Sequence, residues 1–281
     1  MSVERHARDA VSEGAVGAAL PRLVIDEVSK SFNGHAALAN VSFTVAEHEF
    51  VAILGPSGAG KTTLFRCIAG LLKPDRGVAR LGDQDIATLK GRERRHIALV
   101  FQQYNLVSRL TALDNVLAGR LGHVAAWRGC FRRFERADRL LALECLDRVG
   151  MLSQATQRAG TLSGGQQQRV AIARALAQQP RLIVADEPVA SLDPNSAGGV
   201  MGLIRSIAHT DGLAVICSLH QVNFARTYAD RIIGLSHGRV VFAAPTEKFD
   251  QAAYANLHDM RTGLPASGQS QCDQSARSPT N

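Results

Sequence analysis

The chain has 281 residues, of which 46% are hydrophobic and 20% are charged, and this composition is typical of a globular protein rather than a disordered or collagen-like one. No apolar run approaches the roughly 18–20 residues that span a bilayer, and residues 1–20 lack the continuous apolar core of a signal peptide, so we expect a soluble cytoplasmic protein. The net charge of +7 is compatible with an anionic partner of any kind, and five scattered cysteines without a CxxC pair predict reduced thiols.

Short apolar runs alternate with helical stretches along most of the chain. We predict flexible extensions at residues 1–20 and 258–281, which are polar and aperiodic. Continuous apolar runs are typical of strands that are covered on both faces, and they predict strands at residues 50–54, 97–101, 182–185 and 213–217. Helices are expected between them at residues 62–71, 166–178 and 194–208. This alternation predicts an α/β sheet core.

One region interrupts the alternation. From about residue 103 to residue 165 the pattern is almost wholly helical, and it predicts a helical subdomain inserted into the sheet domain, as a lid or a docking surface. Within it, residues 137–146 are predicted to form an amphipathic helix. Its expected apolar stripe consists of Leu140, Leu143 and Leu146, broadened by Leu141 and Cys145.

A glycine-rich loop follows the first apolar run. Residues 55–62, GPSGAGKT, match GxxxxGK[ST] in full, between a strand that ends at Leu54 and a helix that begins near Lys61. Such a loop turns backbone N–H groups toward a phosphate chain, Lys61 reaches the β- and γ-phosphates, and the Thr62 hydroxyl binds Mg²⁺. The alternative is a chance strand–helix turn, which the matched context disfavours. The candidate nucleotide-binding residues are Gly55, Pro56, Ser57, Gly58, Ala59, Gly60, Lys61, Thr62 and Thr63.

Two acidic residues end a later apolar run. Asp186 and Glu187 follow residues 182–185, where adjacent carboxylates serve no packing purpose. Asp186 is a candidate ligand of Mg²⁺, directly or through water, and Glu187 is a candidate for polarising the attacking water. A solvated loop is the alternative, and the phosphate loop elsewhere in the chain disfavours it.

Residues 162–169, LSGGQQQR, resemble the signature sequence of ABC ATPases. The other motifs of that family follow the same order along the chain. Gln102 resembles its Q-loop glutamine, residues 191–193 its D-loop, and His220 its switch histidine, while Phe32 stands where the family stacks an aromatic ring on adenine. The resemblance covers about residues 23–249. It implies a P-loop NTPase fold of the ABC type, with a nucleotide-binding domain at residues 21–257.

The resemblance also implies roles for these residues, with ATP and Mg²⁺ as the ligands. Glu187, His220 and Gln102 would be catalytic, and Mg²⁺ would be held by Thr62, Gln102 and Asp186. The start of the signature helix is an anion-binding end, and in this family it faces the γ-phosphate that a second subunit holds. The residues that would contact the ATP held by the second subunit are Ser163, Gly164, Gly165, Gln166 and Asp193. A single copy of each motif therefore implies a homodimer of two-fold symmetry.

The family's importers receive a membrane permease on the helical insert. The insert here carries basic residues with interleaved aromatic residues, which leaves open a nucleic-acid surface, a solvated helix face or docking near the membrane. These residues are Arg120, Arg128, Arg132, Arg133 and Arg136, with Trp127, Phe131 and Phe134. Two other classes are alternatives: a soluble ABC ATPase that acts on nucleic acid or ribosomes, and a regulator that does not hydrolyse ATP. Neither explains the motifs as well.

We therefore expect the ATP-hydrolysing subunit of an importer, peripheral to the cytoplasmic face of the inner membrane. Its expected partners are a second copy of itself, permease subunits and, through the permease, a periplasmic or extracellular substrate-binding protein, with no nucleic acid. Three segments look most like phosphonate-importer ATPases: residues 115–122 with Trp127, residues 185–194 and residues 218–222. The resemblance predicts phosphonate as cargo, with phosphate, phosphite or a phosphate ester as alternatives.

Overall fold

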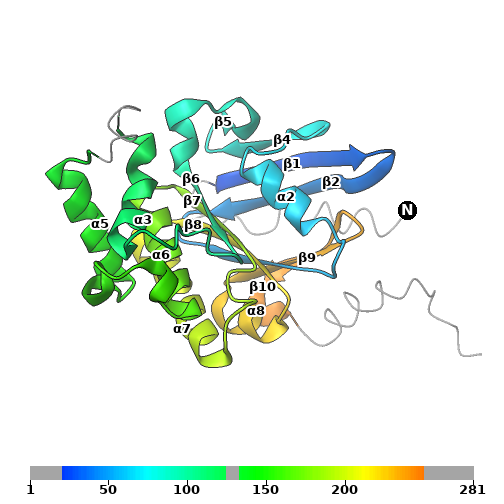
Figure 1. The fold of residues 1–281 in the computed structure, drawn as a ribbon. Helices are drawn as coiled ribbons and strands as arrows, with labels where there is room; N and C mark the ends of the chain where they lie inside the picture. Colours follow the sequence, from blue (N-terminus) through cyan, green and yellow to red (C-terminus); the bar gives the residue numbers. More distant parts are fainter. Residues whose placement is uncertain (1–20, 125–132, 250–281) are drawn as a thin grey trace, which may run out of the picture.

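Two sheets form the body of the protein in the computed structural model, which describes residues 21–124 and 133–249 (Figure 1). The larger sheet has the order β10-β9-β3-β8-β7-β6, and its strands run parallel except for β10 at one edge. These strands are β3 (Phe50–Leu54), β6 (Ile97–Phe101), β7 (Leu182–Asp186), β8 (Ala214–Leu219), β9 (Arg231–Ser236) and β10 (Arg239–Pro245). The predicted extensions 1–20 and 258–281 lie outside the described residues.

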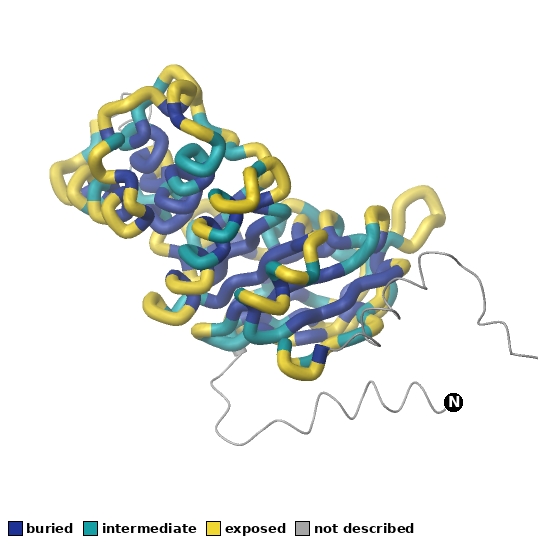
Figure 2. Tube along the Cα trace, turned by 90° about the horizontal axis from the view of Figure 1, so that it is seen from below, coloured by how far each residue is buried: buried dark blue, intermediate teal, exposed yellow. Residues whose placement is uncertain are grey.

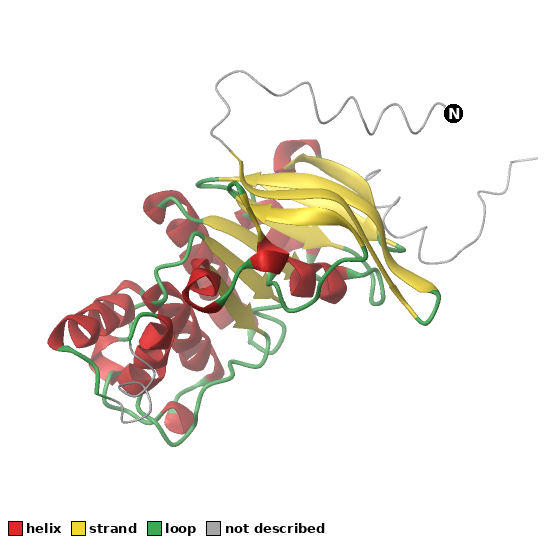
Figure 3. Ribbon diagram, turned by 90° about the horizontal axis from the view of Figure 1, so that it is seen from above, coloured by secondary structure: helices red, strands yellow, loops and turns green. Residues whose placement is uncertain are grey.

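The smaller sheet is antiparallel and was not predicted. Its order is β2-β1-β4-β5. Its strands are β1 (Pro21–Phe32), β2 (His35–Ala46), β4 (Arg76–Leu81) and β5 (Gln84–Asp85). Burial alternates along β2, as expected for a sheet that covers the core with one face and meets solvent with the other. Figure 3 shows the two sheets as adjacent layers, with most helices at the opposite end of the molecule.

Helices cover the larger sheet and build a separate helical group. The α-helices are α2 (Lys61–Ile68), α3 (Ala112–Ala118), α5 (Arg136–Arg148), α6 (Gly164–Ala177), α7 (Pro194–Asp211) and α8 (Val222–Tyr228). The short 3-10 helices are η1 (Ile86–Thr88), η2 (Gly91–His96), η3 (Gly119–Gly122), η4 (Leu152–Gln154), η5 (Ala159–Thr161) and η6 (Thr246–Lys248). Within the described ranges, no helix has the length and apolarity to cross a bilayer.

The larger sheet separates two hydrophobic cores. On β3, Phe50, Ala52 and Leu54 face a core shared with the helices, whereas Val51 and Ile53 face a core shared with α2 and the smaller sheet. Figure 2 shows this burial as dark segments along the strands. Because both faces are covered, β3 and β6 are apolar at every position, and the other parallel strands are apolar along most of their length. The prediction of an α/β core is confirmed.

Helices α3, α5 and α6 pack on one another and lie away from the smaller sheet (Figures 1 and 3). No named strand lies among the described residues of the predicted insert. The predicted stripe of α5 is wrong at Leu140, whose exposed fraction is 49%. The buried stripe is Asp138, Ala142, Cys145, Leu146 and Val149. At about 100° per residue, Leu140 lies on nearly the opposite side of the helix from Ala142.

Arg120 corrects the reading of the basic segment. It is buried, and its Nε donates to Asp138 Oδ1 at 2.9 Å while its Nη1 donates to the carbonyl of Ala177 at 3.0 Å. The guanidinium therefore joins η3, α5 and the end of α6, and it is not available to nucleic acid or lipid. Arg133 and Arg136 are exposed. Trp127, Arg128, Phe131 and Arg132 lie outside the described residues.

The cysteines within the described ranges are free thiols, as predicted. Cys67, Cys145 and Cys217 are all buried. Burial raises the pKa of Cys67 and of Cys145 to about 11, so both thiols stay protonated and unreactive at neutral pH. Cys130 and Cys272 lie outside the described residues.

Candidate functional site

The glycine-rich loop connects β3 to α2 at the carboxyl end of the larger sheet. Gly60, at the N-cap of α2, has φ of +103°, and a Cβ there would lie 2.5 Å from the carbonyl oxygen of Ala37 in β2. Gly58 also has a positive φ, +81°, with open space where a Cβ would lie. Only glycine combines this backbone with such close approach. The loop is thus held against β2 on one side and is open on the other.

Lys61 is the first residue of α2 and is almost fully buried, with an exposed fraction of 6%. Its Nζ donates to the carbonyl of Gly55 at 2.7 Å and to that of Pro56 at 3.1 Å. Burial lowers the pKa of Lys61, and the charges of Glu187 and Asp186 oppose that shift. The structure therefore places the buried amine of α2 near the two predicted carboxylates at the end of β7.

The two acidic residues are adjacent at the end of β7 but have different surroundings. Asp186, the last residue of β7, accepts a hydrogen bond from Ser218 Oγ through its Oδ1 at 2.7 Å. The N–H of Glu187 donates to the same Ser218 oxygen at 2.9 Å, and Glu187 has φ of +50°. Ser218 lies opposite Asp186 in the β7–β8 ladder. None of the sequence motifs assigned to the site includes this serine.

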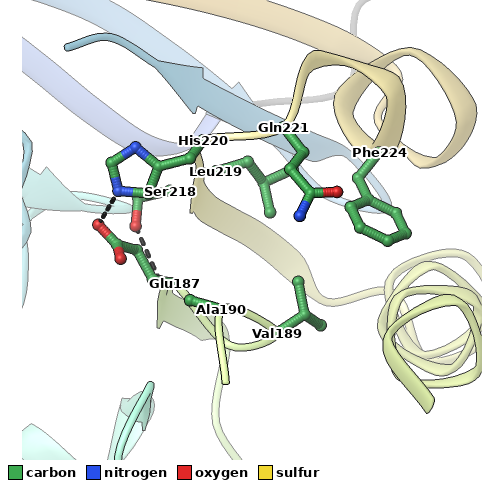
Figure 4. A pocket seen from close by; sticks show the side chains of 8 residues that line it. All are labelled: Glu187, Val189, Ala190, Ser218, Leu219, His220, Gln221 and Phe224. Carbon is green, nitrogen blue, oxygen red and sulfur yellow. Dashed lines mark hydrogen bonds and ion pairs between the residues drawn. The ribbon is translucent and has the colours of Figure 1, made fainter. Parts of the chain in front are cut away.

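His220 completes the group. Its Nε2 lies 2.5 Å from Glu187 Oε1, and Figure 4 shows the two side chains directed at one another. They line a pocket of about 220 Å³ together with Ser218, Phe224 and other residues of these loops. The His220 side chain is 44% exposed and that of Glu187 is 24% exposed. This geometry suits proton transfer at the Glu187 carboxylate, with His220 able to bind an anion or share the proton.

Gln102 lies on the other side of the acidic pair. It directly follows β6, whose last residue Phe101 is opposite Asp186 in the β6–β7 ladder. Its Nε2 is 3.4 Å from Ser191 Oγ, so the two segments predicted as Q-loop and D-loop meet here. Asp193 caps α7 by accepting from the N–H of Ser196 at 3.0 Å, and the hydrogen bonds from Ser196 lower its pKa.

The signature residues begin α6. Ser163 is the N-cap and forms a capping box with Gln166: Ser163 N–H donates to Gln166 Oε1 at 2.9 Å, and Gln166 N–H donates to Ser163 Oγ at 3.3 Å. Gly164 and Gly165 open the helix. A Cβ on Gly164 would lie 2.8 Å from the hydroxyl of Tyr104. Among the described residues, this helix start makes no hydrogen bond to the loop at residues 55–60.

Phe32 stands apart from the carboxylates, at the end of β1. Its ring is 46% exposed, and Lys30 Nζ lies 5.8 Å from the ring centroid. Phe32 pairs with His35 at the start of β2. Gly60 packs against Ala37, two residues further along the same strand. The structure therefore brings together Lys61, Asp186, Glu187 and His220. Phe32 and the signature residues lie outside this group.

A donor set for Mg²⁺ is present in chemical terms. Thr62 offers a hydroxyl, Gln102 an amide oxygen and Asp186 a carboxylate, all hard oxygen ligands. Within the described residues, no three His, Cys, Asp or Glu side chains are placed so that they could together hold a metal ion. One carboxylate with few protein ligands fits Mg²⁺, which is usually bound through one or two carboxylates together with substrate phosphates. A zinc or transition-metal site of the usual kind does not fit.

Comparison with known proteins gives three kinds of match. The family model described as "ABC transporter" matches residues 38–190. The chain is 48% identical to a hypophosphite import ATP-binding protein of Stutzerimonas stutzeri, over 83% of this chain and 70% of the relative. It is 46% identical to a phosphonates import ATP-binding protein of Escherichia coli, over 83% and 93%, and 53% identical to one of Nostoc, over 74% and 80%.

Two solved structures show the same architecture. An ATP-binding cassette in its ADP conformation superposes with a TM-score of 0.77 at 25% identity, over 88% of this chain and all of the other. A dimeric cassette in a post-hydrolysis state, bound to ADP and phosphate, gives a TM-score of 0.69 at 36% identity, over 81% of this chain and 100% of that one.

Proposed function

The chain belongs to the ABC transporter family as an ATP-binding cassette, and from this premise we propose that it hydrolyses ATP to power the import of phosphonates or closely related phosphorus oxyanions. One observation supports the ATPase role above all: Lys61, Asp186, Glu187 and His220 meet at the carboxyl ends of β3, β7 and β8. In open α/β sheets, ligands bind at this edge.

We propose that ATP binds on the glycine-rich loop, along residues 55–63. Lys61 would exchange its two carbonyl partners for phosphate oxygens, which are stronger acceptors because they are charged. Phe32 would stack on the adenine ring. Thr62, Gln102 and Asp186 would hold Mg²⁺, which supplies charge neutralisation at the phosphates.

Hydrolysis is assigned to Glu187 and His220. We propose that the Glu187 carboxylate accepts a proton from the attacking water. Glu187 has a left-handed backbone conformation, and its carboxylate contacts His220. His220 would hold the Glu187 carboxylate in place and bind the phosphate oxygens that carry the developing charge. Gln102 would position the water.

The signature residues are proposed to act on a second copy of the chain. Ser163, Gly164, Gly165 and Gln166 present a helix N-terminus, which attracts phosphate, and Asp193 lies on the neighbouring helix start. Because this end makes no hydrogen bond to the chain's own phosphate loop, a two-fold dimer would place it on the partner's ATP. The dimeric relative in a post-hydrolysis state supports this arrangement.

The cargo and the membrane partners rest on similarity. The relatives named for phosphonate import match over most of their length, and the relative named for hypophosphite import is of similar identity. We therefore propose a peripheral position on the cytoplasmic face of the inner membrane. Permease subunits would dock there, and a substrate-binding protein would act through them. We expect no nucleic-acid partner.

Two experiments test this proposal. In a deletion strain, growth on a phosphonate as sole phosphorus source should fail, while growth on inorganic phosphate should not change. Retained growth and uptake of labelled phosphonate, without a second importer, would reject the cargo, and a defect on hypophosphite alone would reassign it. Affinity purification from membranes should recover a permease. Tight binding of duplex DNA at physiological salt, without a permease, would reject the importer role.

A further inference from the structure

We propose that Ser218 is a positioning residue of this site: its hydroxyl sets both the orientation of the Asp186 carboxylate and the backbone conformation of Glu187. The inference rests on the proposed ATPase function. Ser218 has an exposed fraction of 0% and lies in β8, directly opposite Asp186 in the parallel ladder. Most buried hydroxyl groups in proteins have a hydrogen-bond partner, and Ser218 has two of them in the site.

The chemistry of a single hydroxyl explains how both groups are held at once. Ser218 Oγ has one proton, which it donates to Asp186 Oδ1 at 2.7 Å. With that proton directed at the carboxylate, the lone pairs of the oxygen accept the N–H of Glu187 at 2.9 Å. The bond to a charged acceptor is the stronger kind. This bond fixes the rotation of the Asp186 carboxylate, which we propose as a ligand of Mg²⁺.

The second bond acts on a strained residue. Glu187 has φ of +50°, a left-handed conformation that non-glycine residues rarely adopt. Its N–H is held by Ser218, and its carboxylate reaches His220 at 2.5 Å (Figure 4). Strained residues persist where their surroundings hold them, and they concentrate at functional sites. Ser218 thus connects the proposed metal ligand to the proposed base.

A second buried serine shows that burial alone does not account for these bonds. Ser236 ends β9, a parallel strand of the same sheet, and its exposed fraction is 2%. Its hydroxyl is buried but has no hydrogen-bond partner among the residues that the structure describes. Ser236→Ala is therefore a matched control, since it removes the same atom from a similar depth without breaking a bond.

The test compares the wild type, Ser218→Ala, Ser218→Thr and Ser236→Ala. For Ser218→Ala we expect kcat to fall by about tenfold or more. The Mg²⁺ concentration that gives half-maximal hydrolysis should rise by a similar factor, as is typical when a group that supports a metal ligand is lost. ATP binding without Mg²⁺ should stay within about twofold of the wild type, because the lysine and loop are unchanged. Ser218→Thr keeps the hydroxyl and should restore most of both values, whereas Ser236→Ala should match the wild type.

A readout without nucleotide or Mg²⁺ completes the test. In a crystal structure of Ser218→Ala, the Asp186 carboxylate should be rotated and the Glu187–His220 contact should lengthen beyond about 3.5 Å. An unchanged Asp186–Glu187–His220 geometry with an unchanged Mg²⁺ requirement would overturn the inference, even if the melting temperature fell. If the wild type hydrolyses no ATP, the proposed function fails, and the structures alone still decide whether Ser218 positions these residues.

Discussion

The substitution Glu187→Gln isolates the chemical step from ATP binding. Glutamine keeps the length and shape of the side chain but cannot take a proton from water. The backbone bond from residue 187 to Ser218 does not depend on the side chain and should remain. Lys61 loses one of the two anions that raise its pKa, and Asp186 is retained. We therefore expect the phosphate loop to bind ATP as before.

The magnitude follows from the role of a general base, which contributes about 10²- to 10⁴-fold to a rate. We expect kcat to fall by that factor, or about 3–5 kcal/mol of activation free energy at 1.36 kcal/mol per tenfold. ATP that is bound but not hydrolysed should hold two chains together through the signature residues. Size-exclusion chromatography with ATP and Mg²⁺ should then show a dimer that the wild type forms only transiently.

Single-turnover hydrolysis of labelled ATP is the assay, with Glu247→Gln as a control because Glu247 is exposed in η6, away from the site. The control should hydrolyse ATP at the wild-type rate. If Glu187→Gln hydrolysed ATP within about tenfold of the wild type and stayed monomeric with ATP, the assignment of Glu187 as the base would be refuted.

Three further predictions concern binding, stability and pH. Lys61→Ala should weaken ATP binding by about 100-fold, since each hydrogen bond to a charged group contributes about 1.5–3 kcal/mol. Calorimetry would measure this loss, and Lys73→Ala, which replaces an exposed lysine, should leave ATP affinity unchanged. Leu146→Ala should lower the free energy of unfolding by about 2–5 kcal/mol because Leu146 is fully buried in α5, whereas Leu140→Ala, half exposed in the same helix, should cost well under half of that in a urea titration. Burial lowers the pKa of His96 and of His123 below the usual 6.5, so the unfolded chain binds more protons and stability should fall as the pH drops below about 6.5. Urea titrations from pH 7.5 to pH 5 should show a smaller loss in His96→Asn and His123→Gln than in the wild type, and an equal loss in all three would contradict this prediction.

The parallel strands β3, β6, β7 and β8 were predicted because each is covered on both faces and is therefore a largely continuous apolar run, whereas the parallel strand β9 was not predicted. The smaller sheet was not predicted. Burial alternates along β2, and positive-φ residues such as Glu27 in β1 and Asn40 in β2 interrupt the regular strand pattern. In α5, the helix itself was evident from its spacing. The packing of α3 and α6 then decided that Asp138 is buried and Leu140 exposed.

The site shows the same division. For residues within one motif, such as Gly60 and Lys61, the spacing along the sequence is enough to predict the local geometry. Ser218 was not recognised, because its role depends on the register between β7 and β8, 32 residues apart in the chain. Its one signal was a polar residue at the end of an apolar run, and that signal gains meaning only when the facing residue is known to be Asp186.

Transport by the complete assembly tests the central claim most directly. The chain would be reconstituted with its permease in lipid vesicles, and accumulation of labelled phosphonate, presented by its binding protein, would be measured together with ATP hydrolysis. We predict accumulation that requires ATP and Mg²⁺, hydrolysis that increases with the loaded binding protein, and the loss of both in Lys61→Ala. Phosphonate accumulation that proceeds equally without ATP, or with Lys61→Ala in place of the wild type, would contradict the account.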